Sequence, residues 1–246
     1  MGLILLTNDD GYDSAGLQAL YKELKNNKFE VFVSAPRFQQ SGSSHSLTLR
    51  RPIRVEKLKN DFFIVDGTPT DCVLLAYHDL VRNKEIEMVV SGINHGPNMG
   101  SDVFYSGTVA AALQAGTLGI KKALALSLSG ESYSNFDNAV RYSVNLIQRI
   151  LDKNIQNFIL NVNIPEKQIK GEKITRMGRR IYRDKVLRDV EQNGVMYSVI
   201  DGVLDYHIDT DTDFEAIENN FVSITPLKLD LTDYESMKNL KEVFAR

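Results

Sequence analysis

The chain has 246 residues, of which 43% are hydrophobic and 25% are charged, and its 29 basic and 32 acidic residues give a formal net charge of −3. These proportions are those of an ordinary globular protein, and they exclude fibrous and intrinsically disordered classes. Because the chain has no net positive charge, it has no field that would hold it on a polyanion, so nucleic-acid binding is not expected. The length suits one core with an additional extension.

The amino terminus is expected to be a first strand rather than a targeting segment. Its apolar run is too short for a signal peptide and leads directly into Asp9 and Asp10. No stretch approaches the roughly 20 apolar residues that a membrane span needs. The single cysteine, Cys72, lies in an apolar helical pattern and cannot form an internal disulfide. We therefore expect a cytoplasmic protein.

The first part of the chain alternates between strand and helix patterns. Leu3–Leu6 is a short apolar run, typical of a strand that is covered on both faces of a parallel sheet. A helix is predicted next, with apolar residues at positions 17, 20, 21 and 24, and it ends at Asn26–Asn27. The following run, Glu30–Ala35, predicts a second strand. This order indicates a strand–helix–strand unit.

An insertion follows the second predicted strand and covers residues 36–65. Within it, Leu47–Val55 and Phe62–Val65 have strand patterns, joined by a turn at Asn60–Asp61. We therefore expect a hairpin beside the main sheet.

The alternation then resumes. A helix is predicted from Thr68 to about Val81, because Thr68 is a good N-cap and is followed by Pro69 and an acid in the first turn. The fold class predicted is α/β, with a Rossmann-like, three-layer, doubly wound and mainly parallel sheet that forms a core over residues 1–165. The remaining predicted elements are a strand at Glu87–Ser91, a helix at Thr108–Gly116, a strand at Ala123–Leu128, a helix at Asn135–Asp152 and a strand at Phe158–Val162.

After Pro165 the strand–helix alternation stops. Residues 176–188 are rich in arginine and lysine, which favours a solvated arm that pairs with nearby acids over a polyphosphate site. Since a hairpin without its own core needs a partner surface, residues 166–246 are predicted to form a hairpin arm with a closing strand and helix, exchanged between subunits. Asp209–Asp213 resembles the start of a calcium loop, but Phe214 replaces the turn glycine, so a helix-capping loop is expected.

Two adjacent acids follow the first predicted strand. Ligands of open α/β sheets bind at the carboxyl ends of strands, and a backbone turn at Gly11 would let Asp9 and Asp10 face one cation. Two neighbouring carboxylates repel each other, so a hard divalent ion such as Mg²⁺ or Mn²⁺ is the natural compensator. The alternative is that both acids are solvated and that Asp10 or Asp13 caps the helix. An acidic turn excludes a dinucleotide-binding site, which needs a glycine-rich one.

Two further strand ends supply small and polar residues. The hydroxyl-rich loop around Ser41 is typical either of an oxyanion site or of a flexible polar loop. Asn94 follows the third strand, and its neutral oxygen would complete a hard-ion site without added repulsion. Ser106–Thr108 precede a helix of small residues and form either a phosphate site or a simple N-cap. Because carboxyl ends of parallel strands share one edge of the sheet, we expect these loops to meet there.

These residues form motifs that resemble the SurE family, the stationary-phase survival nucleotidases. The matching segments run in order along the chain, without a substitution at the motif positions: Leu6–Gly11, Ser41–Gly42, Ser91–Asn94 with Gly96 and Asn98–Gly100, Tyr105–Thr108 and Val222–Leu227. The resemblance implies one divalent metal per subunit, Mg²⁺ or Mn²⁺, held by Asp9, Asp10, Ser41 and Asn94. It also implies substrate-binding contacts to phosphate from Asn98, Ser106, Gly107 and Thr108.

The resemblance further implies a 5′-nucleotidase that hydrolyses nucleoside 5′- or 3′-monophosphates and forms a homodimer or homotetramer through its carboxyl-terminal arms. The expected nucleophile is a water activated by the metal, with Asp9 as the catalytic candidate. His45 and Asp9 are the candidates for the general acid. Cleavage of short polyphosphate is left open. Two alternatives remain: a calcium-dependent nucleoside hydrolase, which would release a free sugar, and a nucleotide-binding stress sensor without catalysis.

Overall fold

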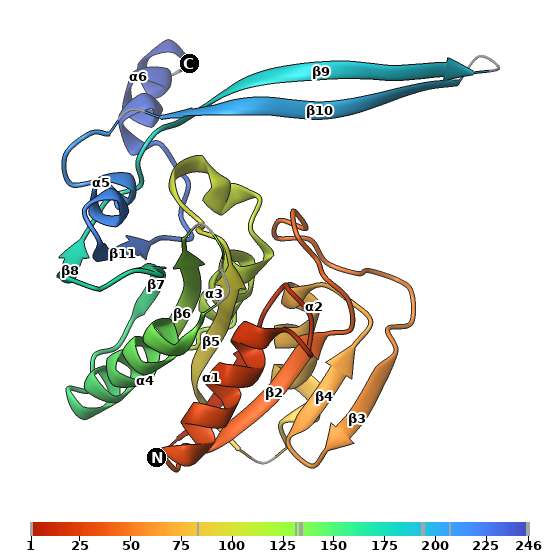
Figure 1. Ribbon diagram of the computed structural model, residues 1–246, viewed down its shortest axis with the longest axis vertical. Coiled ribbons are helices and arrows are strands. Elements are labelled where there is room, and N and C mark those ends of the chain that lie inside the picture. The colour runs from red at the N-terminus through yellow and green to blue at the C-terminus, as the bar shows by residue number, and fades with distance from the viewer. Residues whose placement is uncertain are drawn as a thin grey trace.

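The computed structural model describes residues 2–82, 84–130, 132, 135–192, 195–206 and 208–244, and it describes the backbone alone for 180–192, 195–196 and 200–206. The body is one twisted sheet with helices on both faces, and a long two-stranded ribbon projects from it (Figure 1).

The main sheet contains nine strands among the described residues. In chain order they are β1 (Leu3–Thr7), β2 (Val31–Pro36), β3 (Val55–Lys59), β4 (Phe62–Val65), β5 (Ile86–His95), β6 (Lys122–Ser129), β7 (Phe158–Pro165), β8 (Gly171–Ile174) and β11 (Phe221–Leu227). Their order in space is β3-β4-β2-β1-β5-β6-β7-β11-β8, and all neighbours from β4 to β7 are parallel. Only the β3–β4 and β7–β11 pairs are antiparallel. This mainly parallel order confirms the predicted Rossmann-like α/β class.

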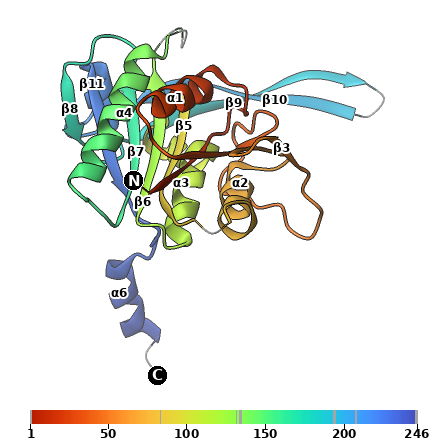
Figure 2. The same ribbon diagram turned by 90° about the horizontal axis from the view of Figure 1, so that it is seen from below.

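Helices cover both faces of the sheet because alternate residues of each strand point to opposite faces. In β1, Ile4 and Leu6 pack with α1 and α4, whereas Leu3 and Leu5 pack with α2 and α3. Figure 2 shows these two pairs of helices on either side of the strands. The helical segments are α1 (Ala15–Asn26), α2 (Pro69–Leu75), the π-helical η1 (Ala76–Leu80), the 3₁₀ segment η2 (Gly100–Phe104), α3 (Gly107–Thr117), α4 (Asp137–Asp152), α5 (Asp213–Glu218) and α6 (Tyr234–Phe244).

The capping predictions are confirmed at two helices. The Thr68 side chain accepts a hydrogen bond from the Asp71 N–H, and the Asp71 carboxylate accepts one from the Thr68 N–H, so α2 begins with a complete capping box. Thr212 caps α5 in the loop that resembles a calcium site, as the sequence predicts. The helix predicted to run to Val81 continues beyond α2 as the π-helical η1.

The prediction for the insertion is wrong in the bounds of its first strand. Leu47–Arg54 is irregular chain, and the strand starts only at Val55. The alternating apolar residues of this segment face solvent, with Leu49 71% exposed, and Pro52 has no N–H for a ladder. The predicted hairpin itself is confirmed, since β3 and β4 pair antiparallel on either side of Asn60–Asp61. Its strand β4 pairs parallel with β2, so β3 and β4 extend the sheet itself.

The carboxyl-terminal segment has two parts with different surroundings. Its strands β8 and β11 join the main sheet, whereas β9 (Arg180–Gln192) and β10 (Val195–Tyr206) form the separate ribbon. Helix α6 also projects from the body and has no buried residue (Figure 2). The predicted division at residue 165, and the exchange of this segment between subunits, stay predictions. Among the described residues, no helix combines the length and apolarity needed to cross a membrane.

Candidate active site

The expected loops meet at the edge of the sheet where the parallel strands end. β1 ends at Thr7, next to Ser91 of β5, and β5 continues to His95, beyond the predicted end at Ser91. Asn94 therefore lies on the strand, opposite Ser127 of β6. Helix α3 begins at the same edge, so the acids after β1 lie beside a helix amino terminus.

Asp9 is buried against the start of α3. Its side chain is 4% exposed, its Oδ2 accepts a hydrogen bond from the Thr108 N–H at 3.1 Å, and its Oδ1 accepts one from the Thr108 hydroxyl. The helix dipole favours a negative charge at this position. Thr108, predicted to contact phosphate, therefore uses both of its donors to hold the candidate metal ligand.

The pKa of the Asp9 carboxyl is raised to about 6, chiefly by burial and to a smaller extent by the charge of Asp10, while the Thr108 hydrogen bonds lower it. Within the described part of the chain, Asp9 has hydrogen-bond donors around it but no ion pair with a basic side chain. A buried acid beside a second acid, without a cationic partner, fits a bound divalent cation.

Asp10 is held by the end of β5. Its Oδ2 accepts the His95 backbone N–H at 3.0 Å and lies 2.9 Å from the ring Nδ1 of the same histidine. The His95 ring packs edge to face on Phe136, with ring centroids 4.8 Å apart. A side chain that hydrogen-bonds a ligand carboxylate fixes its orientation. Sequence reasoning did not assign this role to His95.

Asn94, next to His95, has an amide of fixed orientation. Its Nδ2 donates to the Gly96 carbonyl at 2.8 Å. Because the nitrogen and oxygen of an amide point apart, Oδ1 faces away from Gly96 and is the atom that would bind a cation. The structure thus brings Asp10 into direct contact with His95, the residue next to Asn94.

The Ser41 loop is fastened to the other two elements of the site. The Gln40 N–H donates to the Asp9 carbonyl at 2.7 Å, and the Ser44 N–H donates to the Tyr105 carbonyl at 3.1 Å. Ser41 itself is exposed, and its hydroxyl accepts a hydrogen bond from the Gln39 side chain at 3.0 Å. The loop therefore lies beside Asp9, while the Ser41 hydroxyl is bonded within the loop.

Ser43, in the same hydroxyl-rich loop, lies inside the site. Its hydroxyl oxygen is buried and has no hydrogen-bond partner among the described residues. A Cβ on Gly107 would lie 2.7 Å from this oxygen and 3.1 Å from Asp9 Oδ2. Only glycine at this position lets both groups approach the helix start.

The capping serine, Ser106, accepts the Val109 N–H at 3.1 Å. His45 is turned toward α3, with its Nε2 2.9 Å from Gln114 Oε1.

Asn98, another predicted phosphate contact, lies in a buried polar cluster over β6 and β7. Its N–H donates to Asn163 Oδ1 and its Nδ2 donates to Ser127 Oγ, each at 2.8 Å. Its carbonyl accepts from Asn161 Nδ2 at 2.7 Å and from Asn163 Nδ2 at 3.0 Å. The Asn98 side chain remains 8% exposed. These hydrogen bonds fix the position of the chain around Asn98, between β5 and α3.

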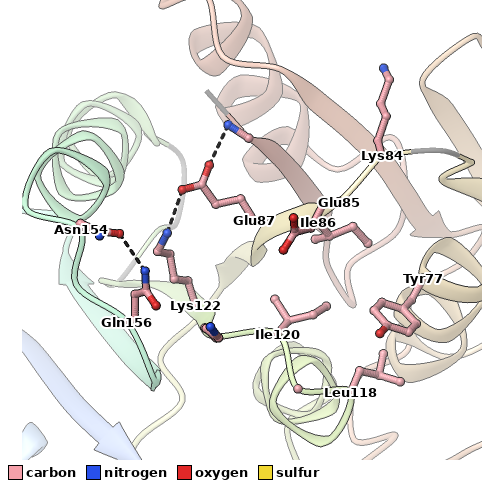
Figure 3. A pocket seen from close by; sticks show the side chains of 13 residues that line it. Tyr77, Lys84, Glu85, Ile86, Glu87, Leu118, Ile120, Lys122, Asn154 and Gln156 are labelled. Atoms are coloured by element: carbon pink, nitrogen blue, oxygen red, sulfur yellow. Dashed lines mark hydrogen bonds and ion pairs between the residues drawn. The ribbon is translucent and has the colours of Figure 1, made fainter.

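A cavity of about 670 Å³ lies at the opposite edge, near the amino ends of β5 and β6 (Figure 3). Its wall includes Glu87, which accepts hydrogen bonds from Lys122 at 2.8 Å and from the Gly2 N–H at 2.7 Å. The charges of Glu87 and Lys122 thus compensate each other. In the described ranges no three His, Cys, Asp or Glu side chains gather as a metal site, and the predicted ligand set contains only two carboxylates, completed by an amide and a hydroxyl.

The chain is similar to known proteins over almost its whole length. Residues 4–184 match the family model described as Survival protein SurE. The 5′-nucleotidase SurE of Aquifex aeolicus (strain VF5) is 40% identical over 247 residues, 98% of each chain. That of Pelobacter propionicus is 43% identical over 241 residues, 96% of each. The crystal structure of the SurE protein from Aquifex aeolicus matches with a TM-score of 0.87 over 98% of this chain and 99% of that one. This chain therefore belongs to the SurE family.

Proposed function

We propose that this protein is a 5′-nucleotidase that hydrolyses nucleoside monophosphates to nucleoside and phosphate with the help of one divalent cation. Relatives about 40% identical over nearly the whole chain carry the name 5′-nucleotidase SurE, which supports the activity. The observation that carries the proposal is the contact between the buried Asp9 carboxylate and the first turn of α3. This contact supports the proposal, because Asp9, the proposed cation ligand, lies beside a helix start that favours anions.

The cation would be held by Asp9, Asp10, Ser41 and Asn94, with Mg²⁺ or Mn²⁺ as the natural choice for oxygen ligands. When bound, it would supply positive charge to the phosphoryl group and lower the pKa of the attacking water. The Ser41 hydroxyl accepts one hydrogen bond from Gln39 and has a second lone pair for the cation, and the Asn94 amide is already oriented.

The chain's own residues divide the remaining work. Thr108 orients Asp9 through two hydrogen bonds. The helix start at Ser106 and Gly107 attracts the phosphate through its partial positive charge, and the Ser106 hydroxyl, which accepts the Val109 N–H, still has its own proton to donate. His95 keeps the second carboxylate in place. His45 and Asp9 stay the candidates for protonating the leaving oxygen.

Phosphate release tests this function. The full chain is incubated with nucleoside 5′- and 3′-monophosphates of each base and with short polyphosphate, in chelator and after Mg²⁺ or Mn²⁺ is added back. We expect phosphate release only with the cation. A free reducing sugar would instead indicate a nucleoside hydrolase, and saturable nucleotide binding without any product would indicate a sensor; either result contradicts the proposal.

We also propose that a second copy of this chain covers the projecting arm. Within the described ranges the two strands of the ribbon pair only with each other, and α6 exposes Leu240, Val243 and Phe244, the last to 76%. Such an apolar helix face and an isolated ribbon both need a partner surface. Light scattering of the full chain should show a dimer or tetramer, and Val243→Asp with Phe244→Asp should weaken it. A wild-type monomer at micromolar concentration would contradict this.

A further inference from the structure

The segment that joins β5 to α3 is held at two buried points. One is the amide cluster around Asn98, described above, and the other lies at Gly100, the first residue of η2. We call Asn98–Gly100 the strap. It lies between the candidate cation ligand Asn94 and the helix start at Ser106, so its position affects the phosphate side of the site.

The second point is the carboxylate of Asp213, which is fully buried. Its Oδ2 accepts the Gly100 N–H at 2.7 Å, and its Oδ1 accepts the Gly178 N–H at 2.7 Å and the Phe214 N–H at 3.0 Å. Thr212 caps α5, so the side chain of the next residue, Asp213, is not needed as a cap and reaches the strap. One carboxylate thus joins residues far apart in sequence.

The packing around this carboxylate leaves no room for a side chain at either of the two glycines that it binds. A Cβ on Gly100 would lie 2.7 Å from the Gly178 carbonyl oxygen, and a Cβ on Gly178 would lie 2.3 Å from Phe214 Cδ2. Gly100 has φ +54°, in the region that favours glycine. The strap and the chain at Gly178 therefore cannot shift independently. Gly178 lies just before β9, which starts at Arg180, so the same contact reaches the root of the ribbon.

We propose that Asp213 is a positioning residue for phosphate binding: it fixes the strap, and with it Asn98 and the approach to Ser106, against the root of the β9–β10 ribbon. This inference rests on the proposed nucleotidase function. Asp213 does not touch substrate. Its effect passes through the Gly100 N–H, while the amide cluster fixes the other end of the strap.

Asp213→Asn tests the proposal. The amide has a single acceptor oxygen for three N–H groups, so at least one of them faces an NH₂ group instead. Since one buried hydrogen bond to a charged group is lost, we expect the KM for the best nucleoside monophosphate and the Ki for inorganic phosphate to rise about tenfold. The kcat should stay within about twofold and the cation concentration for half activity should not change, because Asp9 and Asp10 are untouched.

The matched control is Asp209→Asn. Asp209 lies in the same loop, is half exposed and is 3.8 Å from Arg176 in a surface pair. It should leave KM and Ki at wild-type values. Ser127→Ala changes the contacts at the other end of the strap, where it removes only the acceptor of Asn98 Nδ2. We expect it to raise KM and Ki about threefold, and it decides the question if Asp213→Asn does not fold.

Wild-type KM and Ki in the variants, even with a lower melting temperature, would overturn the proposal, because a purely structural role lowers stability alone. Hydrogen exchange at the Gly100 amide gives a readout that needs no enzyme activity. It should be faster in Asp213→Asn than in the wild type or Asp209→Asn. If wild-type protein releases no phosphate, the proposed nucleotidase function fails. If hydrogen exchange at Gly100 is unchanged in Asp213→Asn, the proposal that Asp213 fixes the strap is overturned.

Discussion

The two edges of the sheet bury charge in opposite ways. At the amino edge, Lys122 is 5% exposed and pairs with Glu87, whose pKa is lowered chiefly by that hydrogen bond. At the carboxyl edge, Asp9 is equally buried, but its pKa is raised because burial is not offset by a cation. The first charge is compensated within the chain and the second is not. The cavity of about 670 Å³ lies at the compensated edge, so unmet charge, rather than cavity volume, indicates the active site.

The largest effect is expected when the uncompensated charge at the carboxyl edge is removed. Asp9→Asn keeps the shape and can still accept the Thr108 N–H, but it removes the charge that would hold the cation. We expect phosphate release to fall by at least ~10²-fold, the scale of losing one electrostatic stabiliser in an active site. Turnover at the wild-type rate, with the fold confirmed by circular dichroism, would refute the assignment.

The second prediction concerns stability in chelator. Folded Asp9 has a pKa of about 6 against an ordinary 3.8, so the folded state binds this proton more tightly than the unfolded state. Stability from this group is therefore fully present below pH 4 and falls as pH rises to above 6, by about 3 kcal/mol. Asp9→Asn should be more resistant to urea than the wild type at pH 8 and should lose that advantage near pH 4. Equal wild-type and variant stability at pH 8 would contradict the raised pKa.

A smaller effect is expected at Asp10. His95→Ala removes the ring that holds the carboxylate, while the backbone N–H of residue 95 remains as a donor. We expect activation by Mg²⁺ to require about tenfold more cation, as for the loss of other groups that orient metal ligands. His78→Ala, far from this edge beside Tyr77, is the control and should leave activation unchanged.

The smallest effect belongs to the compensated edge. Glu87→Gln keeps a hydrogen-bond partner for Lys122 but leaves its buried charge unpaired. We expect a loss of about 1–2 kcal/mol in the free energy of unfolding, measured in urea, with activity per folded molecule unchanged. A large loss of kcat without a stability change would mean that this edge takes part in the reaction.

Local patterns were enough to predict most of the fold. Strand β1 and helix α1 follow from their apolar spacing, and the start of α2 follows from Thr68, Pro69 and Asp71. The strand predicted at Leu47–Val55 failed because alternation alone does not show whether a neighbouring strand or core exists to cover it.

The candidate site was predictable in its positions but not in its contacts. Asp9 and Ser106–Thr108 stand at strand and helix ends that the sequence shows. The His95–Asp10 and Asp213–Gly100 hydrogen bonds join residues 85 and 113 positions apart, and no local signal announces them. Asn163 likewise looked like an ordinary residue beyond a predicted strand, yet it holds Asn98.

The most direct test of the central claim is calorimetric titration of Mn²⁺ into metal-free protein at pH 8, for the wild type and Asp9→Asn. We predict one cation per subunit in the wild type and no measurable binding in the variant. Equal binding by both proteins would show that the buried carboxylate does not hold the cation.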